Sequence, residues 1–356
     1  MAAKRPVKGA SSRSAARKRV YAERTLAETS TPTAKRPLRR GKHYPAPKII
    51  EQLDSIQVSG SGRLEIASKT ALDVTNLGKV FFPEQKLTKG DLMRYYTEVA
   101  TMILPVMADR PLVLKRFPNG VEGQSFFQQN AGDNVPEAVR VETIHTEGSS
   151  TNLRIVGGDL ATLLYTVQLG AVSVDPWHAR VQTLDHADYS ILDLDPGPRA
   201  SFKRVVEVAG WVRETMDELG LHGALKTSGS SGLHIYLPLP PGTPNEAATL
   251  VAQIVATRVT EAHPMAATIE RFVKDRSTTA VYVDYLQNII GKTVAAAYSA
   301  RANPHAMVST PLAWDDLTDD LDPREFTIET APARFARLGD IWAAQLKKKN
   351  SLRALV

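Results

Sequence analysis

The sequence predicts an α+β fold, because helical and strand patterns both occur but do not alternate regularly. Two long segments, 202–219 and 246–261, place apolar residues at helical spacing. Several shorter runs of β-branched and aromatic residues are bounded by Gly, Pro or Asn, as strands are. A doubly wound parallel sheet would need steady strand–helix alternation. We therefore expect a mixed or antiparallel sheet flanked by helices, with the functional site on a sheet face.

Each expected element has a local signal. Thr88 and Asp91 form a capping box that begins a helix, and alternation over 63–74 indicates an extended segment. A Pro-Asn-Gly turn at 118–120 separates two strands. The helices expected are 48–58, 88–107, 159–169, 202–219, 246–261 and most of 314–346, with a loop at Pro323. The strands expected are 111–117, 125–129, 189–195, 233–239, 280–285 and 293–298.

Composition excludes several classes of protein. The chain has 356 residues, of which 43% are hydrophobic, enough for a large core. The sequence has no apolar run of the length that a transmembrane helix needs, and its N-terminus lacks the apolar stretch of a secretory signal. Cysteine is absent, which excludes disulfides, thiol catalysis and Cys-ligated zinc. We expect a cytoplasmic protein that does not bind membranes.

Positive charge is concentrated at the N-terminus. Residues 1–43 hold thirteen Lys or Arg against two Glu, a net charge of +11. Because the whole chain has a net charge of +6, the remaining residues together carry −5. Residues 1–45 contain few large apolar side chains, so we expect a disordered basic arm. Such an arm is attracted to nucleic-acid phosphates. The alternative is a solubilising tail or a processing segment.

Asp193 and Asp195 end a strand in which Ile191, Leu192 and Leu194 flank them. Side chains i and i+2 of a strand point to the same face, roughly 6.5–7 Å apart. Carboxylates at this spacing can bracket a hard divalent cation, and without one a carboxylate is expected to hold a proton. Pro196 and Gly197 then end the strand, which leaves Asp195 at an open edge. An Asp-x-Asp pair also occurs by chance at solvated strand ends, so both interpretations stay open.

A loop rich in Gly and Ser, residues 228–232, lies between Lys226 and His234. Backbone N–H groups and hydroxyls in such a loop can bind an oxyanion, and Lys226 and His234 would add donors. No Gly-Lys-Ser/Thr ends the loop, so it is not a Walker phosphate loop. The alternative is a flexible turn with His234 packed in the core.

Asp284 ends another short strand and is followed by a polar turn and two cations, Lys292 and Arg301. This order suits a third metal ligand with triphosphate contacts behind it. The alternative is an ordinary hairpin with exposed charges.

Two cations, Lys115 and Arg116, precede the aromatic pair Phe126 and Phe127. Adjacent cations can hold phosphates while an aromatic ring stacks on a base. Because neighbouring side chains of a strand point to opposite faces, we expect one ring to stack and the other to pack in the core.

Taken in order, these segments resemble the polymerase domain of bacterial ligase D, in the archaeo-eukaryotic primase–polymerase superfamily. The resemblance covers nearly all of residues 70–345, and the order of the motifs carries it. It implies a primase–polymerase core with an RRM-like sheet and two interlocked subdomains over 46–350. The matching motifs are Asn76, Lys79-Val80-Phe81-Phe82-Pro83, Lys115-Arg116-Phe117-Pro118-Asn119-Gly120, Phe126-Phe127, Asp193-Leu194-Asp195-Pro196, Ser228-Gly229, Gly232-Leu233-His234, Asp284-Tyr285, Gln287-Asn288, Lys292-Thr293, Tyr298-Ser299 and Arg301.

The resemblance also implies a role for each matching residue. Asp193, Asp195 and Asp284 match the catalytic ligands of two Mn²⁺ or Mg²⁺ ions. Lys79 and Lys89 match a pair that recognises the 5′-phosphate on the downstream side of a gap. The matches to contacts with the incoming nucleotide are Ser228, His234, Gln287, Lys292 and Arg301. Phe126 or Phe127 matches template-stacking positions, and Lys115 and Arg116 are the further candidates for DNA binding.

The implied activity is template-directed nucleotidyl transfer that fills short gaps or extends ends in DNA repair, with a preference for ribonucleotides. The implied partners are gapped, nicked or broken DNA carrying a 5′-phosphate, an NTP or dNTP, a DNA ligase of the C or D type and an end-binding protein. This places the protein at the nucleoid. Because no ligase or nuclease module follows in this sequence, we expect a stand-alone relative that works with ligase C.

The sequence departs from the family pattern in the pocket. Family members commonly have His-Pro-Trp where this chain has Asp175 before Pro-Trp, with His178 directly after. Ser231 stands where Lys or Thr is common, and the Arg276 segment is one residue out of register. These departures support an alternative, a non-catalytic DNA gap- or end-binding protein with a degenerate pocket. A metal-dependent nuclease is a further alternative, although it leaves the residues that match nucleotide contacts unexplained.

Overall fold

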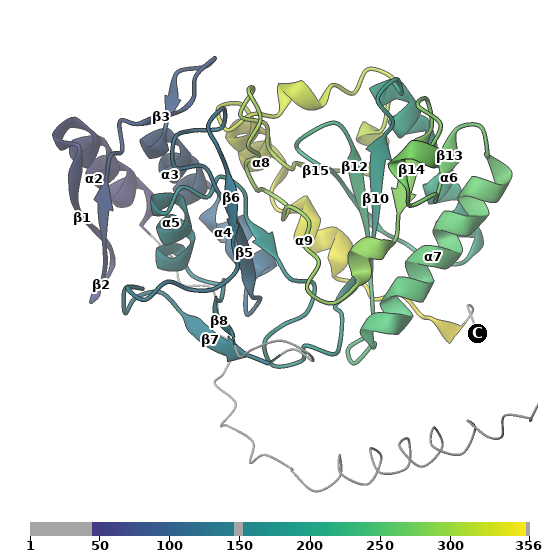
Figure 1. Ribbon diagram of the computed structural model, residues 1–356, viewed down its shortest axis with the longest axis horizontal. Helices are drawn as coiled ribbons and strands as arrows, with labels where there is room; N and C mark the ends of the chain where they lie inside the picture. The colour runs from purple at the N-terminus through teal and green to yellow at the C-terminus, as the bar shows by residue number, and fades with distance from the viewer. Residues whose placement is uncertain (1–44, 146–151, 354–356) are drawn as a thin grey trace, which may run out of the picture. The chain divides into compact units, whose positions relative to one another are not determined.

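The structure, a computed structural model, describes residues 45–145 and 152–353. The predicted arm over 1–45 therefore lies outside the described residues, except for Pro45. The described chain has the predicted α+β fold, with helices and strands in irregular order (Figure 1). None of the helices in these two ranges is both long and apolar enough to span a bilayer.

A six-stranded sheet organises the C-terminal half, in the order β13-β14-β10-β12-β11-β15. Neighbouring strands are antiparallel except β13 and β14, which are parallel, so the sheet is mixed as predicted. The strands are β10 (Tyr189–Pro196), β11 (Ala224–Thr227), β12 (Leu233–Pro238), β13 (Ala267–Thr268), β14 (Val281–Asp284) and β15 (Pro311–Leu312).

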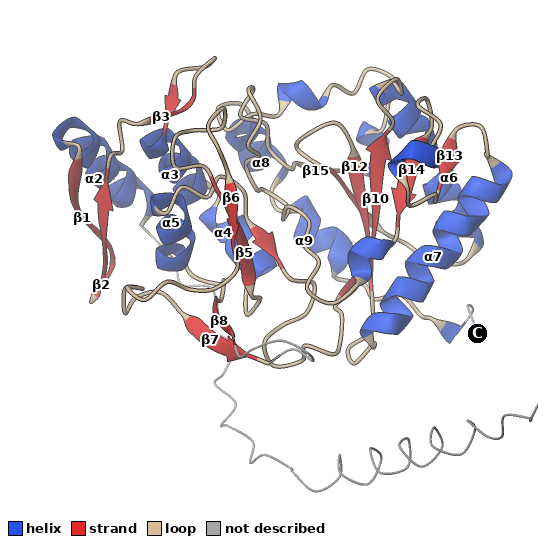
Figure 2. Ribbon diagram, viewed as in Figure 1, coloured by secondary structure: helices blue, strands red, loops and turns tan. Residues whose placement is uncertain are grey.

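Two helices cover one face of this sheet, α6 (Phe202–Glu218) and α7 (Asn245–Ala262) (Figure 2). Leu192 and Leu194 of β10 are fully buried beneath them. Asp193 and Asp195 alternate with these leucines, so they point to the opposite face. The apolar pattern of β10 thus determines which face carries the carboxylates.

The N-terminal half consists of helices and smaller sheets. Its helices are α2 (Ala46–Ser59), α3 (Lys89–Glu98), α4 (Ala100–Met107) and α5 (Leu160–Gln168). The sheets are the hairpins β1–β2 (Ser61–Ala67, Thr70–Thr75), β3–β4 (Val80–Phe82, Leu87–Thr88) and β7–β8 (Val141–Ile144, Asn152–Ile155), and the sheet β6-β5-β9 (Phe126–Gln128, Leu112–Arg116, Asp175–Pro176).

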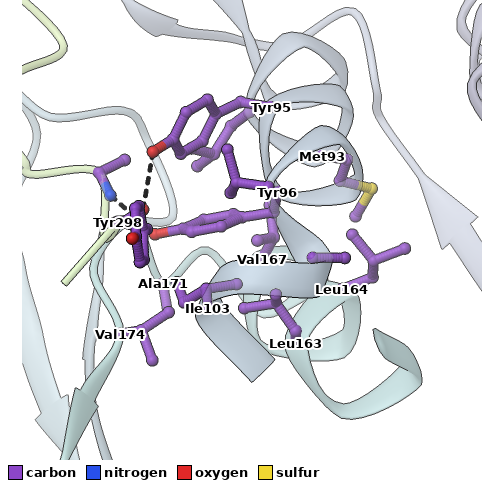
Figure 3. Packing of buried hydrophobic residues seen from close by; sticks show 14 of the residues in the cluster. Met93, Tyr95, Tyr96, Ile103, Leu163, Leu164, Val167, Ala171, Val174 and Tyr298 are labelled. Carbon is purple, nitrogen blue, oxygen red and sulfur yellow. Dashed lines mark hydrogen bonds between the residues drawn. The ribbon is translucent and has the colours of Figure 1, made fainter. Parts of the chain in front are cut away.

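Two tyrosines of α3 hold the segment that follows β14 against the N-terminal helices (Figure 3). The hydroxyl of Tyr95 donates to the carbonyl of Tyr298 at 2.7 Å. The hydroxyl of Tyr96 donates to the carbonyl of Val172 at 2.6 Å and accepts from the N–H of Ala300 at 3.1 Å. The two hydrogen bonds to Tyr298 and Ala300 tie together segments about 200 residues apart in the sequence, and the one to Val172 spans 76 residues.

Most predicted elements are confirmed. The helices over 48–58, 159–169, 202–219 and 246–261 correspond to α2, α5, α6 and α7. The predicted strands correspond to β5, β6, β10, β12 and β14, and the extended segment forms the β1–β2 hairpin. Thr88 caps α3 through the predicted box with Asp91.

Three predictions about elements are wrong. The helix over 88–107 is two helices, because Val99, at φ −90° and ψ 8°, ends α3. Residues 293–298 form no strand: Thr293 makes an isolated bridge to Trp177, and Tyr298 takes a positive φ of 69°, which ends the extended backbone. The segment 314–346 contains the turns η3 (Trp314–Asp316) and η4 (Pro323–Glu325) and only two short helices, α8 (Ala331–Leu338) and α9 (Ile341–Leu346), because Gly339 ends α8 with φ +69°.

Candidate active site

Four neighbouring strands carry a row of polar side chains on the face opposite α6 and α7. In the sheet register, Asp193 of β10 pairs with Asp284 of β14 on one side and with His234 of β12 on the other. His234 in turn pairs with Lys226 of β11. Residues paired across antiparallel strands share a face. The fold therefore brings together Asp284, Asp193 and His234, which are far apart in the sequence, and Asp195 lies on the same face two residues along.

Burial raises the pKa values of the three carboxylates, and the charges of neighbouring carboxylates add to this at Asp195 and Asp284. Burial raises the pKa of Asp193 to about 6. Loss of solvent, followed by the charges of Asp193 and Asp284, raises the pKa of Asp195 to about 7. Burial also raises the pKa of Asp284, and the charge of Asp193 adds to this. Like charges held this close disfavour ionisation of the whole cluster.

Local hydrogen bonds orient Asp284. Its Oδ1 accepts from the N–H of Leu286 at 2.7 Å, and its Oδ2 accepts from Nε2 of Gln287 at 3.0 Å. The buried side chain of Asn288 joins this turn, η2 (Leu286–Asn288), to β10: it accepts from Ile191 N at 2.7 Å and donates to Ile191 O at 2.8 Å. Gln287, predicted to contact the nucleotide, thus has a partner within the site.

The Gly/Ser loop, residues 228–232, is shaped by its own hydrogen bonds. Ser228 Oγ accepts from the N–H groups of Ser230 and Gly232, each at 3.1 Å. Arg301 Nη1 donates to Ser228 O at 2.6 Å. A Cβ on Gly232 would lie 2.2 Å from the carbonyl oxygen of Leu194, so only glycine lets the loop approach β10 this closely. The predicted loop thus lies beside the carboxylate strand, with Arg301 beneath it.

Lys226 is buried and its ammonium is used within the protein, which corrects the prediction that it adds a donor to the loop. Its side chain is 0% exposed, and its ammonium lies within 2.6 to 2.9 Å of His234, Ala295 and Ser309. Burial, followed by the charge of Arg301, lowers its pKa well below the ordinary value. His234 is also buried, and burial followed by Lys226 lowers its pKa.

The remaining pocket residues occupy different positions around the row. Arg276 lies with its guanidinium carbon 3.4 Å from the ring centre of Tyr282, which pairs with Asp195. Ser231 and Lys292 are exposed, on the Gly/Ser loop and on the turn after η2. Tyr282 was missed in the sequence, although its spacing of two before Asp284 signals a shared face.

Asp175 and His178 lie on the segment that includes β9. Asp175 pairs with Val113 of β5, and its Oδ2 accepts from Ser173 Oγ at 2.5 Å. Burial raises its pKa, which the charges of Arg301, Lys226 and Lys115 partly offset. The imidazole of His178 is buried, and burial lowers its pKa to about 3.

The two lysines predicted to bind a 5′-phosphate lie close together. The N–H of Lys89 donates to the carbonyl of Lys79 at 2.8 Å. The ammonium of Lys89 donates to Gln168 Oε1 at 2.9 Å, and that of Lys79 to Asn119 Oδ1 at 3.0 Å. Burial, followed by the charge of Lys79, lowers the pKa of Lys89 to about 8.

The aromatic pair differs from the prediction, because both rings are exposed. Phe126 is 46% exposed and Phe127 is 68% exposed. They lie on β6, a three-residue strand at the edge of its sheet, and the exposure of both rings means that neither face of β6 is packed against the core. The guanidinium of Arg116 lies 5.1 Å from the Phe126 ring, and the ammonium of Lys115 lies 5.7 Å from the Phe127 ring. The site therefore presents two cation-backed rings.

A cavity of about 540 Å³ lies beside the Gly/Ser loop. Small-molecule sites commonly have volumes of this order. Its lining includes Ser230 and Ser231 of the loop, Pro196 at the end of β10 and Asn303, which donates to Gly229 O at 2.7 Å. Space for a ligand thus adjoins the loop and the carboxylate strand.

The carboxylates fit a divalent cation in their chemistry. Oδ1 of Asp193 is buried and has no hydrogen-bond partner among the described residues; Nε2 of His234, 3.2 Å away, is not aligned to donate to it. Hard cations prefer such oxygen ligands. In the described part of the chain, however, no three His, Asp or Glu side chains are gathered closely enough to hold a metal as they stand. The donor set fits, and its side chains would have to close around the ion.

An α+β protein with a carboxylate row on a sheet face, beside a Gly/Ser loop and several cations, has the features of a nucleotidyltransferase. The sequence matches the family described as LigD, primase-polymerase domain, over residues 88–342. The chain belongs to this family.

Curated relatives and a solved structure agree with the assignment. The chain is 34% identical over 271 residues to the bifunctional non-homologous end joining protein LigD of Bacillus subtilis, covering 75% of this chain and 43% of the relative. It is 34% identical over 284 residues to the multifunctional non-homologous end joining DNA repair protein LigD of Mycobacterium tuberculosis, covering 77% and 37%. It thus spans less than half the length of these relatives. The polymerase domain from M. tuberculosis ligase D, solved in complex with DNA, matches with a TM-score of 0.72 and 30% identity, covering 78% of this chain and 99% of that one.

Proposed function

We propose that this protein is a template-directed polymerase that fills short gaps or extends ends during DNA repair. The observation that carries the proposal is the row formed by Asp284 and Asp193 on adjacent strands, with Asp195 two residues along. A protein that only binds DNA has no need of a carboxylate cluster whose charges oppose those of DNA. Family membership adds support, since the relatives are described as end joining proteins.

In the proposed reaction a primer 3′-hydroxyl attacks the α-phosphorus of a nucleoside triphosphate, a new P–O bond forms, and pyrophosphate leaves. Asp193, Asp195 and Asp284 would hold Mn²⁺ or Mg²⁺, which when bound lowers the pKa of the attacking hydroxyl and neutralises the leaving pyrophosphate. Arg301 and Lys292 offset the charge that develops on the phosphates. Gln287 holds Asp284 in its orientation.

Primer extension on a short 5′-phosphorylated gap tests the proposal, with Mn²⁺ or Mg²⁺ and with dNTPs and NTPs in separate reactions. We expect Asp193→Ala and Asp284→Ala to abolish extension while DNA binding persists. Asp217→Ala, at an exposed position on α6, is the matched control and retains both. Extension by purified Asp284→Ala protein would contradict the assignment.

The same assay separates the alternatives. Shortening of the labelled strand identifies a nuclease. Tight gap binding without addition under either metal identifies the non-catalytic binding protein, for which Asp175 and the open arrangement of the carboxylates argue. Asp175→His is then the variant that tests whether the pocket has degenerated. The comparison of NTPs with dNTPs measures the proposed preference for ribonucleotides.

We also propose that Lys79 and Lys89 bind the 5′-phosphate on the downstream side of a gap. The ammonium of Lys79 is near enough to lower the pKa of Lys89. A phosphate dianion bound between the two groups would offset this repulsion and favour the charged form of both. The proposed partners beyond DNA and nucleotide are a ligase of the C or D type and an end-binding protein, which fits relatives described as end joining proteins. Deleting residues 1–45 should weaken DNA binding and flatten its salt dependence if the arm contacts phosphates.

A further inference from the structure

Among the residues that the structure describes, the buried ammonium of Lys226 has three hydrogen-bond neighbours, and each can accept a hydrogen bond. Nζ lies 2.9 Å from the carbonyl oxygen of Ala295, 2.6 Å from Oγ of Ser309 and 2.6 Å from Nδ1 of His234. A lysine ammonium has three N–H donors and no acceptor. The number of neighbours therefore equals the number of donors.

Proton counting shows which group donates at each contact. The carbonyl of Ala295 can only accept. The Ser309 hydroxyl donates its single proton to the carbonyl of Thr227 at 2.8 Å, so it accepts from Lys226. Two N–H groups of Lys226 are thereby assigned, and the third points at Nδ1 of His234. Nδ1 must then carry a lone pair, and the proton of a neutral imidazole lies on Nε2.

The opposite arrangement leaves two acceptors facing each other. If Nδ1 of a neutral His234 carried the proton, Nε2 would present a lone pair to Oδ1 of Asp193 at 3.2 Å. Lys226 would also have to be a neutral amine to accept from Nδ1, a form that burial favours and that the charges of Asp193 and Asp175 oppose. Because Lys226, His234 and Ser309 are all buried, water cannot relieve either conflict.

We propose that Lys226 is a positioning residue that holds His234 in the tautomer protonated at Nε2, so that a neutral N–H donor faces the carboxylate row beside Asp193. Its role in catalysis rests on the proposed function, because the donor would serve phosphates bound at that row. The tautomer itself follows from the hydrogen bonds that Lys226 makes as a charged ammonium. If the role of Lys226 were merely structural, it would join β11 to the segments around Ala295 and Ser309 and would not determine the tautomer of His234.

Nitrogen NMR of protein labelled with ¹⁵N-histidine tests the tautomer without metal, DNA or nucleotide. The ring nitrogens of His234, assigned by their loss in His234→Gln, should show an unprotonated Nδ1 and a protonated Nε2. Lys226→Met should shift His234 towards the Nδ1-protonated form. Ser309→Ala is the matched control: it removes one neighbour of Lys226, keeps the contact with His234, and should leave the His234 signals in place.

Kinetics separate positioning from structure. Lys226→Met should lower kcat for primer extension by at least roughly tenfold, as losing an oriented donor does, with the KM for primer DNA unchanged. A wild-type His234 protonated at Nδ1, or a Lys226→Met protein with an unchanged tautomer, would overturn the proposal. If Lys226→Met fails to fold, the wild-type spectrum still tests the tautomer, and a His234 protonated at Nδ1 there would overturn the proposal. Since the spectra need no activity, loss of the polymerase assignment would leave the tautomer result standing.

Discussion

Replacing Asp193 by Asn is predicted to stabilise the metal-free protein at neutral and alkaline pH. Burial raises the pKa of this carboxyl from 3.8 to about 6, so the folded state holds its proton more tightly than the unfolded chain does. Stability is therefore lost as pH rises from about 4 to about 6, and the full penalty remains above that range. A shift of about two pKa units corresponds to about 3 kcal/mol.

Asn carries no charge, so the variant escapes this penalty. We expect Asp193→Asn to raise the free energy of unfolding by up to about 3 kcal/mol at pH 8 and by about 1 kcal/mol near pH 4.5, since the penalty is only partly developed there. Urea unfolding in the presence of a chelator measures the difference at each pH. Asp217→Asn, at an exposed position, is the matched control and should change little.

The expected gain in the free energy of unfolding depends on pH, which distinguishes burial of the charge from other causes of stabilisation. A variant that is no more stable than the wild type at pH 8, or whose advantage is the same at both pH values, would show that burial of the charge is not the cause. The same variant should lose primer extension, because Asn cannot supply the ionised carboxylate that the proposed metal site needs. The wild-type protein thus keeps this carboxylate at a cost in stability.

Three further predictions concern other parts of the chain. Lys79→Ala combined with Lys89→Ala should erase the preference for 5′-phosphorylated gaps, measured as the ratio of Kd values for phosphorylated and unphosphorylated gaps; equal affinities in the wild type would contradict it. Because the pKa of Lys89 is about 8, the wild-type preference should weaken as pH rises above 8 and the side chain loses its charge. Phe126→Ala and Phe127→Ala should each weaken binding of a template strand by about 1–3 kcal/mol, measured by fluorescence anisotropy. If only one of the two variants binds the strand more weakly, only one ring stacks on a base. Asn288→Ala leaves two buried backbone groups of β10 unpaired and should lower the free energy of unfolding by roughly 2–4 kcal/mol, whereas a change below about 1 kcal/mol in urea unfolding would refute the role of this side chain.

The sequence by itself determined the fold class, most of the elements and the family. Period-two and period-3.6 patterns depend on local burial, so β10, α6 and α7 could be read directly from them. The order of short motifs identified the family before any geometry was known, and the Asp-x-Asp spacing placed Asp193 and Asp195 on one face. Local patterns failed where the backbone follows distant contacts, as it does around Tyr298, which α3 holds through Tyr95.

Only the tertiary structure decided how the site is assembled. Strand register across the sheet places Asp284, Asp193, His234 and Lys226 in one row, and no local pattern records which residues of separate strands are paired. The exposure of Phe126 as well as Phe127 depends on what packs against the two faces of β6, and tertiary packing decides this. The burial of Lys226 likewise depends on Ala295 and Ser309, which chain folding brings to it from about 70 and 80 residues away. Long-range pairing thus decides which of the predicted side chains meet and which are left free to meet a ligand.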